Sequence, residues 1–162
     1  MVRLLLGIGN SLSGDDGAGN FVATLIRKPG WIALDCGTVP ENFTGKVREI
    51  SPGLLVLVDA AEMNIRPGEF RVVAPEYIDD VAFGTHALPL RLFIDYVRPY
   101  AGRILFIGIQ PEQIALGAGL SPAVKRAAGR LARLIETEEF EMIEDFIPVE
   151  DGDERPPSNT WT

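Results

Sequence analysis

The sequence has few of the residues from which common enzyme and metal sites are built. Its 162 residues include one cysteine, Cys36, and one histidine, His86. A single cysteine excludes an internal disulfide and favours a reducing, cytoplasmic location. Paired cysteines, the His-Glu-x-x-His motif, the Gly-x-Ser-x-Gly elbow and the Asp-Thr-Gly pattern of pepsin-like proteases are all absent. Cys36 is therefore expected to be a small buried residue and not a nucleophile.

Long apolar runs and an excess of basic charge are also missing. No run approaches the roughly 18 to 20 apolar residues that span a bilayer, so we expect no membrane insertion. The start, "MVRLLLGIGNSL", is interpreted as a first strand and not as a targeting peptide. The net charge is −8, and from Glu136 onward ten acidic residues stand against one arginine, leaving 13 acidic and 14 basic residues before it. This balance argues against a nucleic-acid partner.

Apolar runs alternate with amphipathic segments along residues 1–147, which we interpret as a single domain. The apolar runs predict strands at 3–9, 31–35, 54–60, 69–75 and 103–109, with the fourth at an edge of the sheet. The segments between them predict helices at 16–28, 41–50, 88–98 and 121–135. The fold class is therefore α/β: a three-layer sandwich with a mostly parallel twisted sheet of about five strands and helices on both faces. Residues 148–162 form an acidic tail that we expect to be disordered and to keep the chain soluble.

Carboxylates follow three of the predicted strands. Asp15 and Asp16 lie in the first loop, "GIGNSLSGDDGAG", while Asp35 and Asp59 end the second and third strands. The carboxyl ends of parallel strands form one edge of a sheet, where ligands bind. A nucleotide is a possible ligand, but the third glycine of the dinucleotide fingerprint is replaced by Leu12 and two carboxylates would repel a phosphate.

The acidic pair allows two interpretations. One of Asp15 and Asp16 is expected to cap the helix that follows, which leaves the other free. If the carboxylates of Asp16 and Asp59 approach to about 5 Å, their repulsion of roughly 3 kcal/mol would raise one pKa or favour a bound cation. A lone histidine is more often structural than catalytic. At the same edge, however, His86 would complete a set of one imidazole and two carboxylates that suits a divalent metal.

Five segments, taken in order, resemble the hydrogenase maturation endopeptidases, in particular the type that processes the large subunit of hydrogenase 3. These segments are "GIGNSLSGDDGAG", "DCGTVPEN", "LVLVDAAEMNIRPGEFRVV", "THALPL" and "FIGIQPEQI". The similarity covers roughly residues 3 to 138 and leaves out the acidic tail.

The resemblance implies a peptide hydrolase, classed as an aspartyl protease, that removes a C-terminal extension from the [NiFe] hydrogenase large-subunit precursor after nickel insertion. By motif, the catalytic and metal-binding residues are Asp16, Asp59 and His86. Asp15, Asp35 and Gln110 are secondary candidates. Nickel is expected to come with the precursor, although other divalent ions are expected to occupy the site in vitro. We expect a monomer.

Two other functions stay open at this point. The chain could be a sensor or chaperone that binds the nickel-loaded precursor without cutting it, or a nucleotide-binding α/β domain. Cleavage of the precursor separates the first from an enzyme, and protection by a nucleotide in a thermal melt would favour the second.

Overall fold

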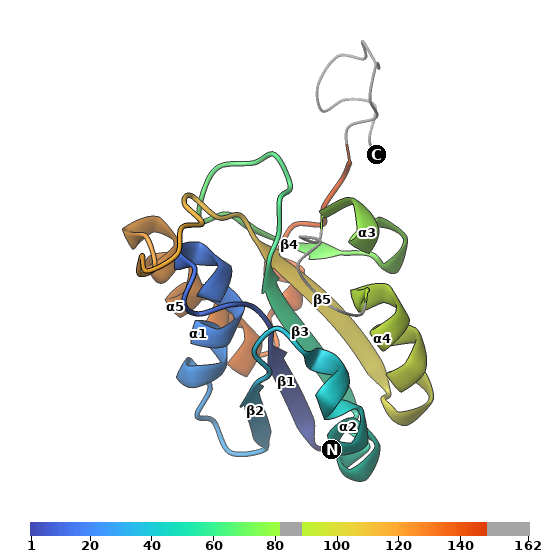
Figure 1. Ribbon diagram of the computed structural model, residues 1–162. Helices are drawn as coiled ribbons and strands as arrows, with labels where there is room; N and C mark the ends of the chain where they lie inside the picture. Colours follow the sequence, from blue (N-terminus) through green and yellow to red (C-terminus); the bar gives the residue numbers. More distant parts are fainter. Residues whose placement is uncertain (82–88, 149–162) are drawn as a thin grey trace.

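The structure is a computed structural model and describes residues 1–81 and 89–148. One sheet lies at its centre, with strand order β2-β1-β3-β5-β4 (Figure 1). The strands are β1 Arg3–Gly7, β2 Trp31–Asp35, β3 Leu54–Ala60, β4 Phe70–Val73 and β5 Arg103–Ile109. The α-helices are α1 Ala18–Leu25, α2 Thr44–Ile50, α3 Ile78–Val81, α4 Leu90–Val97 and α5 Pro122–Glu136. The 3-10 turns are η1 Gly14–Gly17, η2 Pro40–Phe43, η3 Pro75–Tyr77, η4 Arg98–Tyr100 and η5 Phe140–Met142.

The strand directions agree with the sequence patterns. β1, β2, β3 and β5 pair in parallel, while β4 pairs antiparallel with β5 at the edge. β3 is buried along its whole length and lies between β1 and β5, which explains why its sequence, "LLVLVDA", is continuously apolar up to Asp59. The predicted α/β fold with a mostly parallel sheet of five strands is confirmed.

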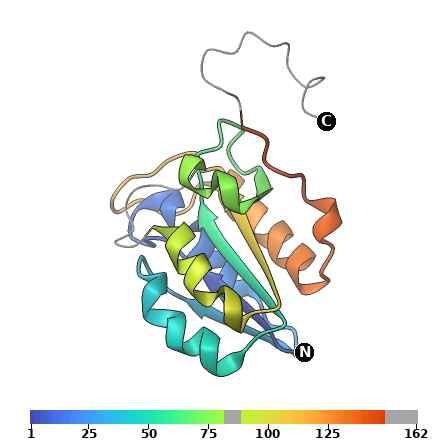
Figure 2. The same ribbon diagram turned by 90° about the vertical axis from the view of Figure 1, so that its right-hand side faces the viewer.

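Helices cover both faces of the sheet, as predicted. α1 and α5 pack on one face around a core that includes Leu5, Val56 and Leu131. α2, α3 and α4 pack on the other face around Leu6, Leu57 and Phe93 (Figures 1 and 2). Since side chains alternate along a strand, each strand contributes to both cores.

The first helix is shorter than predicted. Residues 14–17 form η1, α1 follows from Ala18 to Leu25, and Ile26 has an extended backbone. Glycine at position 19 lets the start of α1 pack directly on the end of β3, because a Cβ atom there would collide with the Val58 carbonyl. α5, by contrast, begins as predicted, since Pro122 opens the helix and the Ser121 hydroxyl accepts a hydrogen bond from Val124 N.

Residues 143–148 add an interaction that the sequence patterns did not predict. Val72 forms a bridge with Asp145, and Phe146 N donates to Val72 O at 2.8 Å, so this segment runs along the outer side of β4. The remainder of the predicted tail, 149–162, lies outside the described residues. Among the helices that the structure describes, none combines the length and apolar character needed to cross a membrane.

Candidate active site

The loop between β1 and α1 lies on the carboxyl edge of the sheet. Ile8 N donates to Val58 O and Gly9 N to Gly37 O, each at 2.9 Å, so the loop is bonded to the last part of β3 and to the residues that follow β2. Gly9 has a φ of +145°, and a Cβ atom there would collide with the carbonyl of Asp16. Glycine is therefore required at this position, because the backbone of Asp16 packs directly over it.

Asp16 is positioned by η1 and is almost buried, with 6% of its surface exposed. Its Oδ2 accepts a hydrogen bond from Asn10 N at 3.2 Å. Among the described residues no donor is bonded to its Oδ1. One oxygen thus fixes the orientation of the carboxylate, and the other can accept a proton or contact a cation.

Asp59 lies near the end of β3, the strand next to β1, and is fully buried. Its Cα pairs in register with Gly108 of β5. By strand alternation its side chain shares the face of Leu57, the face that α2, α3 and α4 cover. Buried carboxylates in proteins are paired, hydrogen-bonded or bound to a metal.

Asp15 has a different environment from its neighbour, and it connects the first loop to the loop after β5. Its Oδ2 accepts hydrogen bonds from Glu112 N and Gln113 N, both at 2.9 Å, and from the Ser121 hydroxyl at 2.8 Å. Its Oδ1 accepts from Ser121 N at 2.7 Å. Burial raises the pKa of Asp15, but these hydrogen bonds together lower it by more than burial raises it. The pKa is therefore below its ordinary value.

The prediction that Asp15 or Asp16 caps the following helix is wrong. Neither η1 nor α1 has a side-chain cap. The side chain of Asp15 instead bonds to residues about a hundred positions further along the chain, and this explains why the loop needs two successive carboxylates. Asp15 anchors the loop and leaves Asp16 available for chemistry.

Asp35 lies at the end of β2 with an exposed carboxylate. Its Oδ1 accepts from Asn20 Nδ2 at 2.6 Å and from Gly37 N at 2.9 Å. Asn20 Nδ2 also donates to Gly9 O at 2.9 Å. Sequence reasoning missed Asn20; the available signal was a polar residue within the apolar pattern of the first helix. Asn20 holds Asp35 against the first loop.

Gln110 follows β5 and holds the loop that begins after Asp59. Its Oε1 accepts from Met63 N, and its Nε2 donates to Glu62 Oε2, both at 2.8 Å. Its backbone is bonded to Gly68 and Glu69. These contacts give Gln110 a structural role at the edge of the sheet.

The first loop does not have the free donors of a phosphate-binding loop. The backbone N–H groups of Gly9, Ser13, Gly14, Asp15 and Asp16 all donate to carbonyl oxygens within the protein. Phosphate loops use such groups, unpaired, to hold the anion. The geometry therefore gives no support to the nucleotide-binding alternative.

Cys36 is buried between Asp35 and Gly37, as predicted. Burial, and secondly the negative charge of Asp35, raise the pKa of its thiol to about 12. A thiol with this pKa is almost fully protonated at neutral pH and is a poor nucleophile.

We therefore expect Cys36→Ala to leave the rate of the precursor processing that the resemblance implies within about twofold of the wild type, because the thiolate is not populated. Iodoacetamide should likewise fail to inactivate the folded wild-type protein. Both are measured by gel-based processing assays with a thermal melt to confirm folding. A large loss of activity in a variant whose melting temperature is unchanged would restore the thiol as a candidate.

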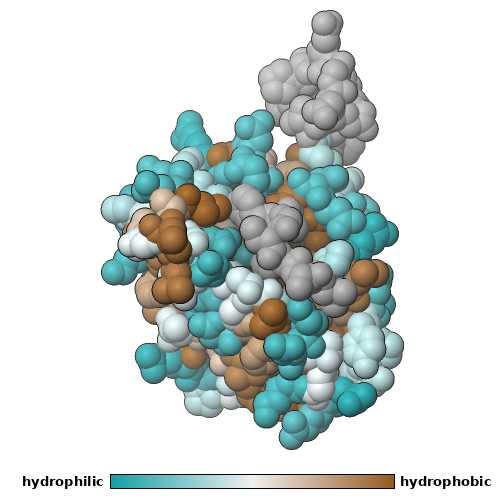
Figure 3. Space-filling view, viewed as in Figure 1, coloured by the Kyte–Doolittle hydropathy of each residue, from teal (hydrophilic) through white to brown (hydrophobic). Residues whose placement is uncertain are grey.

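A pocket of about 240 Å³ opens beside the first loop, between α1 and the loop after β5. Its apolar lining comes from Phe21 and Leu120, and its polar side chains are those of Ser11, Asn20, Thr24 and Asp35. Exposed hydrophobic side chains lie in the two loops next to it: Leu12, Ile114 and Leu116. Figure 3 shows hydrophobic surface in this region, over the loop that follows β5. The edge with the carboxylates thus also offers an apolar binding surface.

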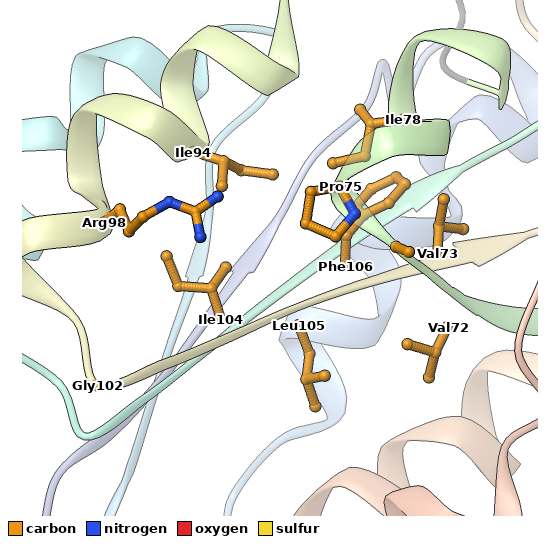
Figure 4. Close-up of a pocket in the computed structure, with 11 residues that line it drawn as sticks. Val72, Val73, Pro75, Ile78, Ile94, Arg98, Gly102, Ile104, Leu105 and Phe106 are labelled. Carbon is orange, nitrogen blue, oxygen red and sulfur yellow. The ribbon is translucent and has the colours of Figure 1, made fainter.

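A second cavity, of about 190 Å³, lies along the first half of β5, away from the carboxyl edge. Figure 4 shows Ile78, Ile94 and Phe106 around it, with the Arg98 side chain between Ile94 and Ile104. Its lining is apolar apart from Arg98 and backbone groups, so it holds no carboxylate or imidazole that could catalyse hydrolysis.

His86 lies outside the described residues, so its position relative to Asp16 and Asp59 stays a prediction. Within residues 1–81 and 89–148, no three His, Cys, Asp or Glu side chains are grouped as a metal site. A metal site at this edge therefore requires a ligand from outside those ranges or from a binding partner.

Comparisons with known proteins agree with the fold and show the family. The family model described as hydrogenase maturation protease matches residues 21–138. The hydrogenase 3 maturation protease of Escherichia coli K12 is 35% identical over 140 residues, covering 84% of this chain and 90% of that protein. A putative hydrogenase maturation protease of Methanocaldococcus jannaschii is 29% identical over 155 residues, covering 88% of this chain and 89% of that protein.

Solved structures show the same similarity. The solution structure of the endopeptidase HycI from Escherichia coli superposes with a TM-score of 0.84 at 33% identity, covering 93% of this chain and all of that one. The crystal structure of a [NiFe] hydrogenase maturation protease HycI from Thermococcus kodakarensis superposes with a TM-score of 0.73 at 36% identity, covering 86% of this chain and 92% of that one.

Proposed function

Since this chain belongs to the hydrogenase maturation protease family and is an endopeptidase, we propose that it removes the C-terminal extension of a [NiFe] hydrogenase large-subunit precursor after nickel insertion. The names of the Escherichia coli and Thermococcus relatives support this class of substrate. One observation carries the proposal: two almost or fully buried carboxylates lie at the carboxyl edge of the sheet, Asp16 in the loop after β1 and Asp59 near the end of the neighbouring strand β3.

Nickel enters this proposal as part of the substrate. Asp16 and Asp59 would contact the ion together with His86, giving the carboxylate and imidazole ligands that suit a divalent metal. The segment that contains His86 connects α3 to α4, two helices on the sheet face that Asp59 shares. An empty precursor site would offer no cation to attract these two carboxylates. Nickel-free precursor would therefore bind poorly, and the protease would select the loaded form.

Hydrolysis requires a base for the attacking water. We assign this role to the same carboxylates: Asp16 or Asp59 takes a proton as the water oxygen adds to the scissile carbonyl carbon. The proton then passes to the peptide nitrogen while the C–N bond breaks, so that an acid and an amine leave. The free Oδ1 of Asp16 is a suitable acceptor, because the bond from Asn10 N holds only the other oxygen.

The precursor must also be held in an extended form near these carboxylates. The 240 Å³ pocket beside Asp35 is suited to an apolar side chain of the precursor, with Phe21 and Leu120 as contacts. Asp35 would be a binding residue at its polar end, oriented by Asn20. The anchored loops on both sides would keep the pocket in place without the substrate.

We expect the purified protein to shorten nickel-loaded precursor and to leave nickel-free precursor intact, because only the loaded form offers the ion that the two carboxylates would contact. Mobility on a denaturing gel and the mass of the released peptide measure this directly. Adding nickel to the nickel-free precursor before the protease should restore cleavage.

The same assay separates the alternatives. Tight binding of the loaded precursor with no released peptide would indicate a sensor or chaperone. Equal cleavage of loaded and empty precursor would contradict the proposed role of nickel in recognition while leaving the peptidase activity in place.

A further inference from the structure

One face of α5 forms a basic groove together with the loop before β4. This groove has a volume of about 790 Å³ and is lined by five cationic side chains against the single carboxylate of Glu69. The cations are Arg66, Lys125, Arg126, Arg130 and Arg133. They make up five of the 15 lysines and arginines in a chain whose net charge is −8. The concentration of positive charge is therefore local.

Four of the five cations of the groove have neither a carboxylate nor an aromatic partner among the described residues. In the ion pairs of the part of the chain that the structure describes, none of the five is paired with a carboxylate. Glu69, the acidic residue of the groove, contacts Arg71 at 3.5 Å. Arg130 alone has an aromatic partner, since its guanidinium lies 4.8 Å from the centre of the Phe70 ring. The groove thus offers unpaired positive charge to a partner.

The groove adjoins the loops of the candidate active site. A Cβ atom at Gly68 would lie 2.9 Å from Ala123 O, so the loop before β4 packs on the first turn of α5. That turn begins at Ser121, which is bonded to Asp15 beside the candidate carboxylate. On the other side, Gly68 N donates to Gln110 O at 2.9 Å. A protein seated at the carboxyl edge would extend over the groove.

We propose that this groove binds an acidic surface of the precursor protein, outside the segment that is cut. This proposal rests on the proposed function. A large folded substrate must contact more of the protease than the few residues beside the scissile bond. Positive charge next to the site would raise the rate of encounter with an acidic partner. Protein is favoured over nucleic acid because Glu69, Ala123 and Ala127 give the groove an acidic and an apolar part, and because the whole chain is acidic.

The test compares two variants with the same change in charge. Lys125→Glu/Arg126→Glu reverses two exposed cations at the start of α5, where acidic side chains are compatible with the helix dipole. The control, Lys46→Glu/Arg48→Glu, makes the same change on α2, on the opposite side of the sheet. Thermal melts confirm that both variants fold.

At about 50 mM salt we expect kcat/KM of the α5 variant for nickel-loaded precursor to fall about tenfold, with kcat at saturation unchanged. The control should stay within about twofold of the wild type, and the difference should disappear at about 500 mM salt, where charges on the surface are screened. Equal losses in both variants, no loss in either, or a lower kcat in the α5 variant would overturn the proposal.

Two further measurements identify the occupant. If the acidic tail of this chain covered the groove, deleting residues 149–162 would lower KM for the wild type but not for the α5 variant, and this would overturn docking of the precursor. A short DNA duplex that binds the wild type and not the α5 variant would also overturn it. Failure of the wild type to cut the precursor contradicts the proposed function, whereas normal cutting with identical salt dependence in both variants contradicts the docking alone.

Discussion

Asp16→Asn is expected to abolish processing of nickel-loaded precursor while leaving the protein folded. An asparagine retains the oxygen that accepts the hydrogen bond from Asn10 N, so the loop should keep its conformation. It removes the negative charge needed to contact a cation or to accept a proton from water. Loss of a general base alone lowers a rate by about 10²- to 10⁴-fold, and loss of metal recognition adds to this.

Asp59→Asn is expected to behave in the same way, since its carboxylate would share the ion with Asp16. Because Asp59 is fully buried, its variant needs an independent test of folding. Thermal melts and circular dichroism provide this test, and the rate is followed by single-turnover cleavage at excess enzyme. Single-turnover conditions exclude product release as the step that changes.

The matched control is Asp95→Asn, which neutralises an exposed carboxylate on α4 that contacts Arg98 at 3.6 Å. It alters the net charge equally and should leave processing unchanged. The proposed pair is contradicted if either Asn variant, correctly folded, processes the precursor at the wild-type rate. A variant that binds loaded precursor normally but does not cut it would assign that carboxylate to proton transfer alone.

The sheet and its active edge could be predicted because they follow from short-range patterns. Continuous apolar runs that end in carboxylates fix the strands, and the parallel arrangement brings the ends of β1 and β3 together. Asp59 is an example: its position at the end of "LLVLVDA" already indicates that it lies at the carboxyl edge. Likewise Ser121 and Pro122 mark the start of α5 from the sequence alone.

The division of roles between Asp15 and Asp16 could not be predicted in this way. Both residues have the same side chain, and the first turn of a helix suits either as a cap. The difference depends on Glu112 and Ser121, which lie 97 and 106 positions away along the chain. The bond from Asn20 to Asp35 was missed for a related reason, because it links a helix to a strand through side chains alone.

The second large effect expected is on stability. Asp15→Ala should reduce the free energy of unfolding by about 3–5 kcal/mol at neutral pH, because four donors around the buried carboxylate would lose their acceptor. The whole free energy of unfolding of a typical domain is only about 5–15 kcal/mol. Asp15→Asn should lose less, since its one carbonyl oxygen still accepts from part of this set. Urea denaturation measures both, with Asp79→Ala, an exposed residue, as the control.

Hydrogen exchange can show that this loss is local in origin. The backbone amides of Glu112, Gln113 and Ser121 donate directly to Asp15 in the wild type. The exchange rates of these amides should rise more from wild type to Asp15→Asn than the exchange rates of the β3 amides, which lie in the centre of the sheet. Uniformly faster exchange would instead indicate a general loss of stability.

The effect of Asp15 should also depend on pH in a defined direction. Its pKa is lower in the folded protein than in the unfolded chain, where an aspartate has a pKa of about 3.9. Folding therefore favours the charged form, and its stabilisation is fully present above about pH 5. It is lost as the pH falls through the folded pKa, where both states become protonated. The difference in free energy of unfolding between wild type and Asp15→Asn should thus be largest at neutral pH and shrink on acidification. A constant difference down to a pH of about 3 would show that the carboxylate acts through its shape and not its charge.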